Sequence, residues 1–122
     1  MNEVSNKFNI WTFSSEIDIP NDVDGYLIKN EEALLAFKTI RDIAIFTNKR
    51  IIIRDAQGIM GKKIETYTIP YSSINMYSTE NAGFIDINTE LELWTKAGHL
   101  KINLKKGIDI SKIDKIIANY IL

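Results

Sequence analysis

From residue 40 to residue 94 the sequence alternates between short strand patterns and turn residues, and this alternation restricts the fold more than any other feature. Asn48-Lys49, the glycines at 58 and 61, and the stretch 81–83 separate the strand patterns with residue types that favour tight turns. Together with the flanking patterns, strands are expected at residues 33–40, 43–47, 50–54, 63–69, 73–80, 85–95 and 100–104. A series of successive hairpins predicts a mainly β, antiparallel domain.

The last hairpin shows the most regular alternation. Between residues 85 and 95, apolar and small side chains fall on one face and polar side chains on the other, with a period of two residues. A two-residue turn at Ala97-Gly98 matches both faces at once. It predicts four cross-strand pairs, which are Leu93 with Ile102, Leu91 with Leu104, Glu90 with Lys105, and Trp94 with Lys101.

Near the C-terminus the period changes from that of a strand to that of a helix. The apolar stripe of the expected helix consists of Ile110, Ile113, Ile116, Ile117, Tyr120 and Ile121. Ser111 and Asp114 form a capping pattern at its start, and Asp109 is a competing cap. The chain therefore predicts a barrel or roll of about seven antiparallel strands, with one C-terminal helix covering its open end.

Residues 1–30 are expected to form an N-terminal segment that precedes the main domain at residues 31–122. Four large apolar side chains are unusual for a free tail, so part of the segment is expected to be docked on something: Phe8, Ile10, Trp11 and Phe13. Pro20 favours the first turn of a short helix over about residues 20–28.

The composition excludes several classes of function. The chain has no cysteine, which excludes disulfides, thiolate metal sites and catalytic thiols. Its net charge of −1 argues against a nucleic-acid partner. The first residues lack the basic and apolar regions of a signal peptide, and no run approaches the roughly 18 apolar residues of a membrane helix. We therefore expect a soluble, cytoplasmic protein.

The sequence offers few groups for catalysis. His99 is the one histidine of the chain, and it is expected as an exposed hairpin residue. Three acidic residues share a strand face on which Lys101 and Lys105 should pair with them: Asp86, Glu90 and Glu92. The glycines at 58 and 61 lack the spacing of a phosphate-binding loop. We expect no catalytic residue, no cofactor and no metal site.

Short motifs spread over residues 31–122 resemble those of one known family. In chain order they are Glu31-Glu32, Ala36-Phe37-Lys38, Arg41-Asp42, Phe46-Thr47-Asn48-Lys49-Arg50, Asp55-x-Gln57-Gly58, Gly61-Lys62-Lys63, Ile69-Pro70-Tyr71-x-x-Ile74, Glu80-x-Ala82-Gly83, Leu91-x-Leu93-Trp94 and Gly107-Ile108-Asp109-Ile110. Their order and spacing are similar to those of the bacterial PH-domain (pleckstrin-homology-like) family. The resemblance implies a PH-like barrel capped by one helix, ring-like homo-oligomers, and no particular reaction.

The hairpin at residues 43–54 indicates where copies of the chain could meet. Its turn places Ala44, Phe46, Ile51 and Ile53 on one face, and three isoleucines on the other. Only one face of a strand in a small barrel points inward, so the second face needs cover, either from residues 8–13 or from a neighbouring copy. The predicted interface residues are Ile43, Ile45, Ile52, Arg54 and Trp94. A head-to-tail contact would have to close into a ring or grow into a filament.

Two other interpretations remain open. A monomeric PH-like module could bind an unidentified protein, peptide or small ligand through a sheet edge or through basic turns. Four basic residues on turns could contact an anionic membrane surface, each contributing about 1 kcal/mol: Lys49, Arg50, Lys62 and Lys63. Because four such residues predict weak binding, strong membrane contact is not expected.

Overall fold

The computed structural model describes residues 10–80 and 87–122 of the 122-residue chain. The elements in chain order are β1 (Ile10–Ile17), η1 (Val23–Gly25), β2 (Ala33–Thr39), β3 (Ile43–Thr47), β4 (Arg50–Gln57), β5 (Lys63–Pro70), η2 (Tyr71–Ser73), β6 (Ile74–Thr79), β7 (Thr89–Thr95), β8 (Gly98–Leu104) and α2 (Ile110–Ile121). The predictions for Phe8, Ile85, Asp86 and the turn at 81–83 lie outside the described residues.

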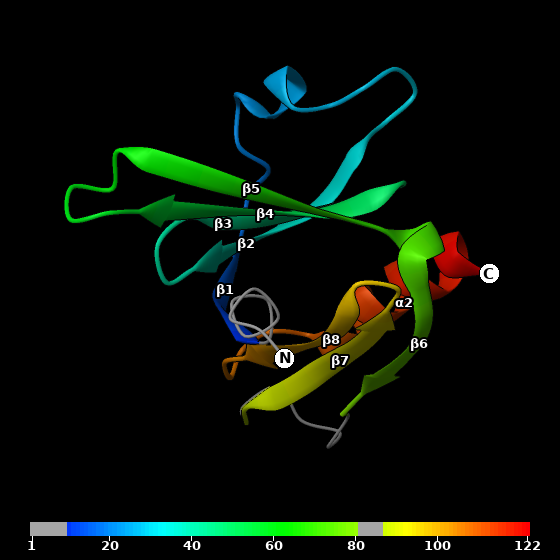
Figure 1. The fold of residues 1–122 in the computed structure, drawn as a ribbon. Helices are drawn as coiled ribbons and strands as arrows, with labels where there is room; N and C mark the ends of the chain where they lie inside the picture. Colours follow the sequence, from blue (N-terminus) through cyan, green and yellow to red (C-terminus); the bar gives the residue numbers. More distant parts are fainter. Residues whose placement is uncertain (1–9, 81–86) are drawn as a thin grey trace.

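The strands form one curled sheet that is not closed into a barrel (Figure 1). The strand order is β5-β4-β3-β2-β1-β8-β7-β6, so that β5 and β6 are the two end strands. The mainly β fold with one C-terminal helix is confirmed. The described sheet has eight strands rather than about seven, because residues of the N-terminal segment add β1 between β2 and β8. A second difference is that β1 and β8 run parallel, whereas the other neighbours are antiparallel.

The inner face of the sheet carries the main core. Phe13, Phe37 and Phe46 form an aromatic centre, with ring centroids between 5.2 and 6.2 Å apart. In the β3–β4 hairpin, Ala44 lies opposite Ile53 and Phe46 opposite Ile51, which confirms the turn at Asn48-Lys49. All four of these hairpin side chains are fully buried, as the alternation predicted.

The β7–β8 hairpin has a different register from the predicted one. Leu93 lies opposite Leu100 rather than Ile102, a shift of two residues, because the turn is at Lys96-Ala97. Thr95 sets this turn, since its hydroxyl accepts a hydrogen bond from the Ala97 amide (3.0 Å) and donates one to the Gly98 carbonyl (2.9 Å). Gly98 follows at φ 135°, a conformation that favours glycine. A shift of two leaves every side chain on its predicted face.

The C-terminal helix α2 begins where Asp109 caps it. The Asp109 carboxylate accepts a hydrogen bond from the Ser111 amide at 3.0 Å. Asp109, rather than Ser111, is therefore the N-cap residue. Ile110, Ile113 and Ile117 are buried, and the helix packs on η2 and β6 beside the corner that joins β5 to β6 (Figure 1). Among the described residues, no helix has both the length and the apolar character to cross a membrane.

The N-terminal segment is structured differently from the expectation. Residues 10–17 form a strand inside the sheet, and the short helix expected over 20–28 is reduced to the three-residue 3-10 turn η1. From the end of β1 the chain passes above the β2–β5 half of the sheet before it enters β2 (Figure 1). This path decides which faces of the molecule are open.

Candidate functional site

The second face of the β3–β4 hairpin is covered by the chain itself. Ile45 and Ile52 are 0% and 1% exposed, and they pack with Val23 and Ala36. Residues 17–32, which run from the end of β1 to the start of β2 and are called the covering segment below, supply most of the surrounding apolar side chains: Ile17, Ile19, Tyr26 and Leu27. In this arrangement the side chains of Ile45 and Ile52 offer no surface to a neighbouring copy.

The other two interface candidates on this hairpin lie at the margin of the covered face. Ile43 is half-buried against the same cluster. The Arg54 guanidinium lies 5.0 Å from the centroid of the Tyr26 ring, donates to the Tyr26 hydroxyl, and lies 3.6 Å from the Asp42 carboxylate. These contacts fix Arg54 against the covering segment, so its charge is balanced within the chain.

Arg50 holds the covering segment through an ion pair with Glu31. The side chain of Glu31 is 0% exposed, and Arg50 binds both of its oxygens, at 2.9 and 3.1 Å. Burial alone would raise the pKa of Glu31, but hydrogen bonds from Arg50, the Thr47 hydroxyl and the Ile28 amide lower it to about 2. Arg50 also donates to the Tyr26 carbonyl at 2.8 Å. The Arg50 guanidinium therefore holds the covering segment in place and is not free to bind a phosphate.

The basic residues predicted as an anion site do not form one patch. Lys49 lies on the turn before β4, whereas Lys62 and Lys63 follow the turn after β4. A strand of this length separates its ends by roughly 25 Å. All three lysines are exposed, but only Lys62 and Lys63 are neighbours.

Trp94 lies half-buried on the outer face of β7. Its ring lies 4.9 Å from that of His99, and its other strand neighbour is Met76, which is 55% exposed. His99 in turn lies 2.6 Å from the Glu92 carboxylate. Lys101, the expected neighbour of Trp94, lies opposite Glu92 and contacts Glu90 at 3.8 Å instead. Trp94 and Met76 thus remain partly accessible apolar groups near the β6 edge.

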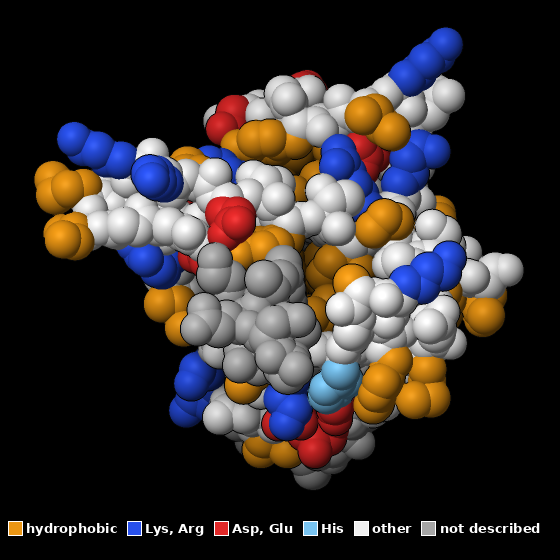
Figure 2. Space-filling model, in the orientation of Figure 1, with side chains coloured by type: hydrophobic (Ala, Val, Ile, Leu, Met, Phe, Trp, Pro, Cys, Tyr) orange, Lys and Arg blue, Asp and Glu red, His pale blue; other side chains and the backbone are white. Residues whose placement is uncertain are grey.

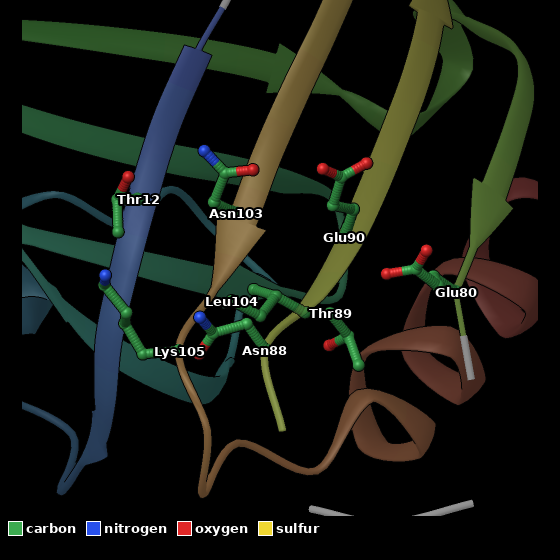
Figure 3. A pocket seen from close by; sticks show the side chains of 8 residues that line it. All are labelled: Thr12, Glu80, Asn88, Thr89, Glu90, Asn103, Leu104 and Lys105. Carbon is green, nitrogen blue, oxygen red and sulfur yellow. The ribbon is translucent and has the colours of Figure 1, made fainter. Parts of the chain in front are cut away.

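A polar pocket of about 310 Å³ lies over the ends of β1, β7 and β8 (Figure 3). Its lining combines two carboxylates, one ammonium group, two amides and two hydroxyls, which come from Thr12, Glu80, Asn88, Thr89, Glu90, Asn103 and Lys105. The described residues contain no cluster of three or more Asp, Glu, His or Cys side chains that could hold a metal ion. The pocket is suited to hydrogen bonding with a small polar molecule.

Thr89 is the most informative residue of the polar pocket. It is 5% exposed, and its hydroxyl has no hydrogen-bond partner among the described residues. Buried hydroxyl groups normally have a hydrogen-bond partner. A hydroxyl without one at a pocket wall therefore marks a place where a ligand could supply the missing hydrogen bond. The strand alternation had assigned Thr89 to the apolar face, and a polar residue in line with Leu91 and Leu93 was the one sequence signal for this pocket.

A model of the family described as bacterial PH domain matches residues 4–121. Over 95 residues the chain is 42% identical to the uncharacterized protein YjqA of Bacillus subtilis (strain 168), covering 75% of this chain and 76% of that protein. It is 27% identical over 99 residues to the uncharacterized protein YozO of the same organism, covering 81% of this chain and 86% of that protein. None of these descriptions names a reaction.

Solved structures share the fold. A DUF1696 family protein with a pleckstrin-homology domain from Shewanella loihica superimposes with a TM-score of 0.78 at 38% identity, covering 88% of this chain and 97% of that chain. A pleckstrin homology domain from Shewanella amazonensis gives a TM-score of 0.64 at 42% identity, with 83% of each chain covered. The family resemblance and the PH-like fold predicted from the sequence motifs are therefore confirmed.

Proposed function

The chain belongs to the bacterial PH domain family, and we propose that it is a non-enzymatic PH-like module that self-assembles into a ring-like homo-oligomer and serves as a binding or scaffold domain. The observation that supports assembly is the open sheet, whose two end strands are β5 and β6. An end strand carries backbone donors and acceptors along its outer edge, which is a template for pairing with another chain.

The two ends of the sheet differ, and this difference supports a head-to-tail assembly. Pairing β5 of one copy with β6 of the next is a head-to-tail contact, which either closes into a ring or continues as a filament. On β6, the Glu80 amide donates to the Glu90 carbonyl at 2.9 Å. Because hydrogen-bonded pairs alternate along antiparallel strands, the backbone amides of Tyr77 and Thr79 face the outer edge. Trp94 and Met76 lie close to this edge and would be covered by the added strand.

Removing one outward amide should weaken the assembly. We expect size-exclusion chromatography with light scattering to give the wild-type protein a mass several times that of the 14.0 kDa chain. Thr79→Pro removes an amide that points away from β7, so it should shift the mass towards that of a monomer without unfolding the sheet. Thr79→Ser keeps the amide and should leave the mass unchanged. A wild-type mass of 14 kDa at micromolar concentration would exclude the ring, and an unchanged Thr79→Pro assembly would place the interface elsewhere.

A second candidate function is the binding of a small polar ligand in the pocket around Thr89. The Thr89 hydroxyl favours this function, because it is buried at the pocket and has no hydrogen-bond partner among the described residues. The carboxylates of Glu80 and Glu90 suit a ligand that carries hydroxyl or amino groups, such as a polyol or an amino sugar.

Thr89→Val separates ligand binding from structure. Valine has the shape of threonine without the hydroxyl, so we expect the melting temperature to stay the same or to rise, by the equivalent of up to about 1 kcal/mol. A thermal-shift screen with polyols, amino sugars and amino acids should find compounds that stabilise the wild-type protein and have no effect on Thr89→Val. A lower melting temperature for Thr89→Val would show that the hydroxyl has a structural partner.

A further inference from the structure

A second pocket, of about 320 Å³, opens between parts of the curled sheet that are far apart in the strand order. The end of β5 forms one side, the turn between β7 and β8 forms the other, and β1 contributes one residue. Most of its lining is aromatic or aliphatic: Trp11, Tyr67, Ile69, Pro70, Ala97 and Leu100. It is called the apolar pocket below. In Figure 2 a hollow with apolar side chains inside it lies between these two halves of the molecule.

The base of the apolar pocket belongs to the main core. Ile69 and Leu100 are each 7% exposed, and both pack in the core cluster that fills the inside of the sheet. Trp11 and Tyr67 pack against the same cluster, with their rings edge-on and their centroids 5.3 Å apart. These contacts hold the apolar walls in place without a ligand. A preformed, mainly apolar cavity of about 300–1,000 Å³ with a few polar groups is typical of a small-molecule site.

Lys96 gives the apolar pocket one positive charge. Its backbone amide donates to the Ser73 carbonyl at 3.0 Å, which fixes the β7–β8 turn against the residues that follow β5. Lys96 is exposed and makes no ion pair among the described residues. None of the described lining residues is acidic, and Glu65, which accepts a hydrogen bond from the Tyr67 hydroxyl at 2.7 Å, does not line the pocket. An apolar cavity with one cation at its rim suits a molecule that has an apolar body and one carboxylate.

We propose that the apolar pocket binds a small monocarboxylate with an aromatic or aliphatic body, such as a phenylalkanoate or a medium-chain fatty acid. The body lies against Trp11, Ile69 and Leu100, where removing apolar surface from water provides the affinity. The carboxylate lies at the rim beside the Lys96 ammonium group, which selects an anion. The site shares no lining residue with the polar pocket around Thr89. It is formed within a single copy, so it does not depend on the proposed assembly.

Isothermal titration calorimetry of the full chain with 3-phenylpropionate and with octanoate tests the proposal. We expect dissociation constants of roughly 1 mM or tighter for ligands of this size. The uncharged 3-phenylpropanol should bind about fivefold more weakly, because it lacks the attraction to Lys96. Lys96→Gln should weaken 3-phenylpropionate by the same factor of about five and leave 3-phenylpropanol unchanged. Trp11→Ala should weaken both compounds by roughly fivefold or more, because it removes part of the apolar wall.

Lys63→Gln is the matched control, because it makes the same charge change on an exposed lysine at the far end of β5, roughly 23 Å along the strand from Pro70. It should leave the affinity for both acids unchanged, as should Thr89→Val in the polar pocket. Both lysines are exposed, so circular dichroism should show these variants folded even if Trp11→Ala is not.

Four results would overturn the proposal. The first is that neither acid binds at about 10 mM. The second is that Lys96→Gln binds 3-phenylpropionate as tightly as the wild type does. The third is that Lys63→Gln or Thr89→Val is as damaging as Lys96→Gln, since binding would then follow net charge or take place in the polar pocket. The fourth is binding that weakens as the protein concentration rises, because a second copy would then occupy the pocket.

Discussion

Replacing Ile45 with aspartate is expected to unfold the domain rather than to release monomers from an assembly. Ile45 is 0% exposed and lies in a cluster with Val23 and Ile52 that residues 17–27 cover. A carboxylate placed there has no partner, and the cost of burying it is several kcal/mol. Because a domain is stable by only about 5–15 kcal/mol, we expect the free energy of unfolding to fall by roughly 4 kcal/mol or more. Urea denaturation followed by circular dichroism measures this loss.

Ile45→Val provides the control for this experiment. It removes one methylene group from the same site and should cost about 1 kcal/mol, with cooperative unfolding preserved. A folded, cooperative Ile45→Asp protein with a reduced assembly mass would contradict the expectation. That outcome would mean that residues 17–27 can leave this face and that a neighbouring copy covers it.

In the two hairpins with clear alternation, local patterns in the sequence predicted which side chains share a face of the strand, but not what covers each face. The alternation in the β3–β4 hairpin correctly separated Phe46 and Ile51 from Ile45 and Ile52. Both sets are buried, however, because the chain before β2 folds back over the outer one. That return depends on contacts between residues far apart in the sequence, such as the hydrogen bonds between Glu31 and Arg50. A period of two residues contains no information about such contacts.

The same limit applies to β1 and to the polar pocket. The strand β1 pairs in parallel with β8, about ninety residues later in the chain, and no local turn signal specifies that pairing. Thr12 and Asn103, on these two strands, line one pocket only because of this pairing. Ile59 and Met60 differ, because they stand between two glycines and their position on a turn can be recognised from the sequence. The hydrogen bond from Arg41 to the Gly58 carbonyl, beside these two residues, could be found only in the structure.

Glu31→Gln is expected to destabilise the domain by about 3 kcal/mol at neutral pH. The folded-state pKa of Glu31 is about 2, compared with an ordinary value of 4.5, and each unit of difference corresponds to about 1.4 kcal/mol. Glutamine keeps the shape of the side chain but loses the charge that Arg50 binds, and it leaves a half-buried guanidinium without its counter-ion. A loss of this size should lower the melting temperature by on the order of 10 °C.

The pH dependence identifies the ionic part of this effect. A carboxylate with a depressed folded-state pKa stabilises the fold fully above its unfolded value of about 4.5, and this contribution is lost as the pH falls towards 2. The difference in melting temperature between wild type and Glu31→Gln should therefore narrow from pH 7 to pH 3. Glu32→Gln, on the exposed neighbouring residue, should show little difference at either pH. If the gap for Glu31→Gln were as wide at pH 3 as at pH 7, the charge of Glu31 would not be what anchors the covering segment.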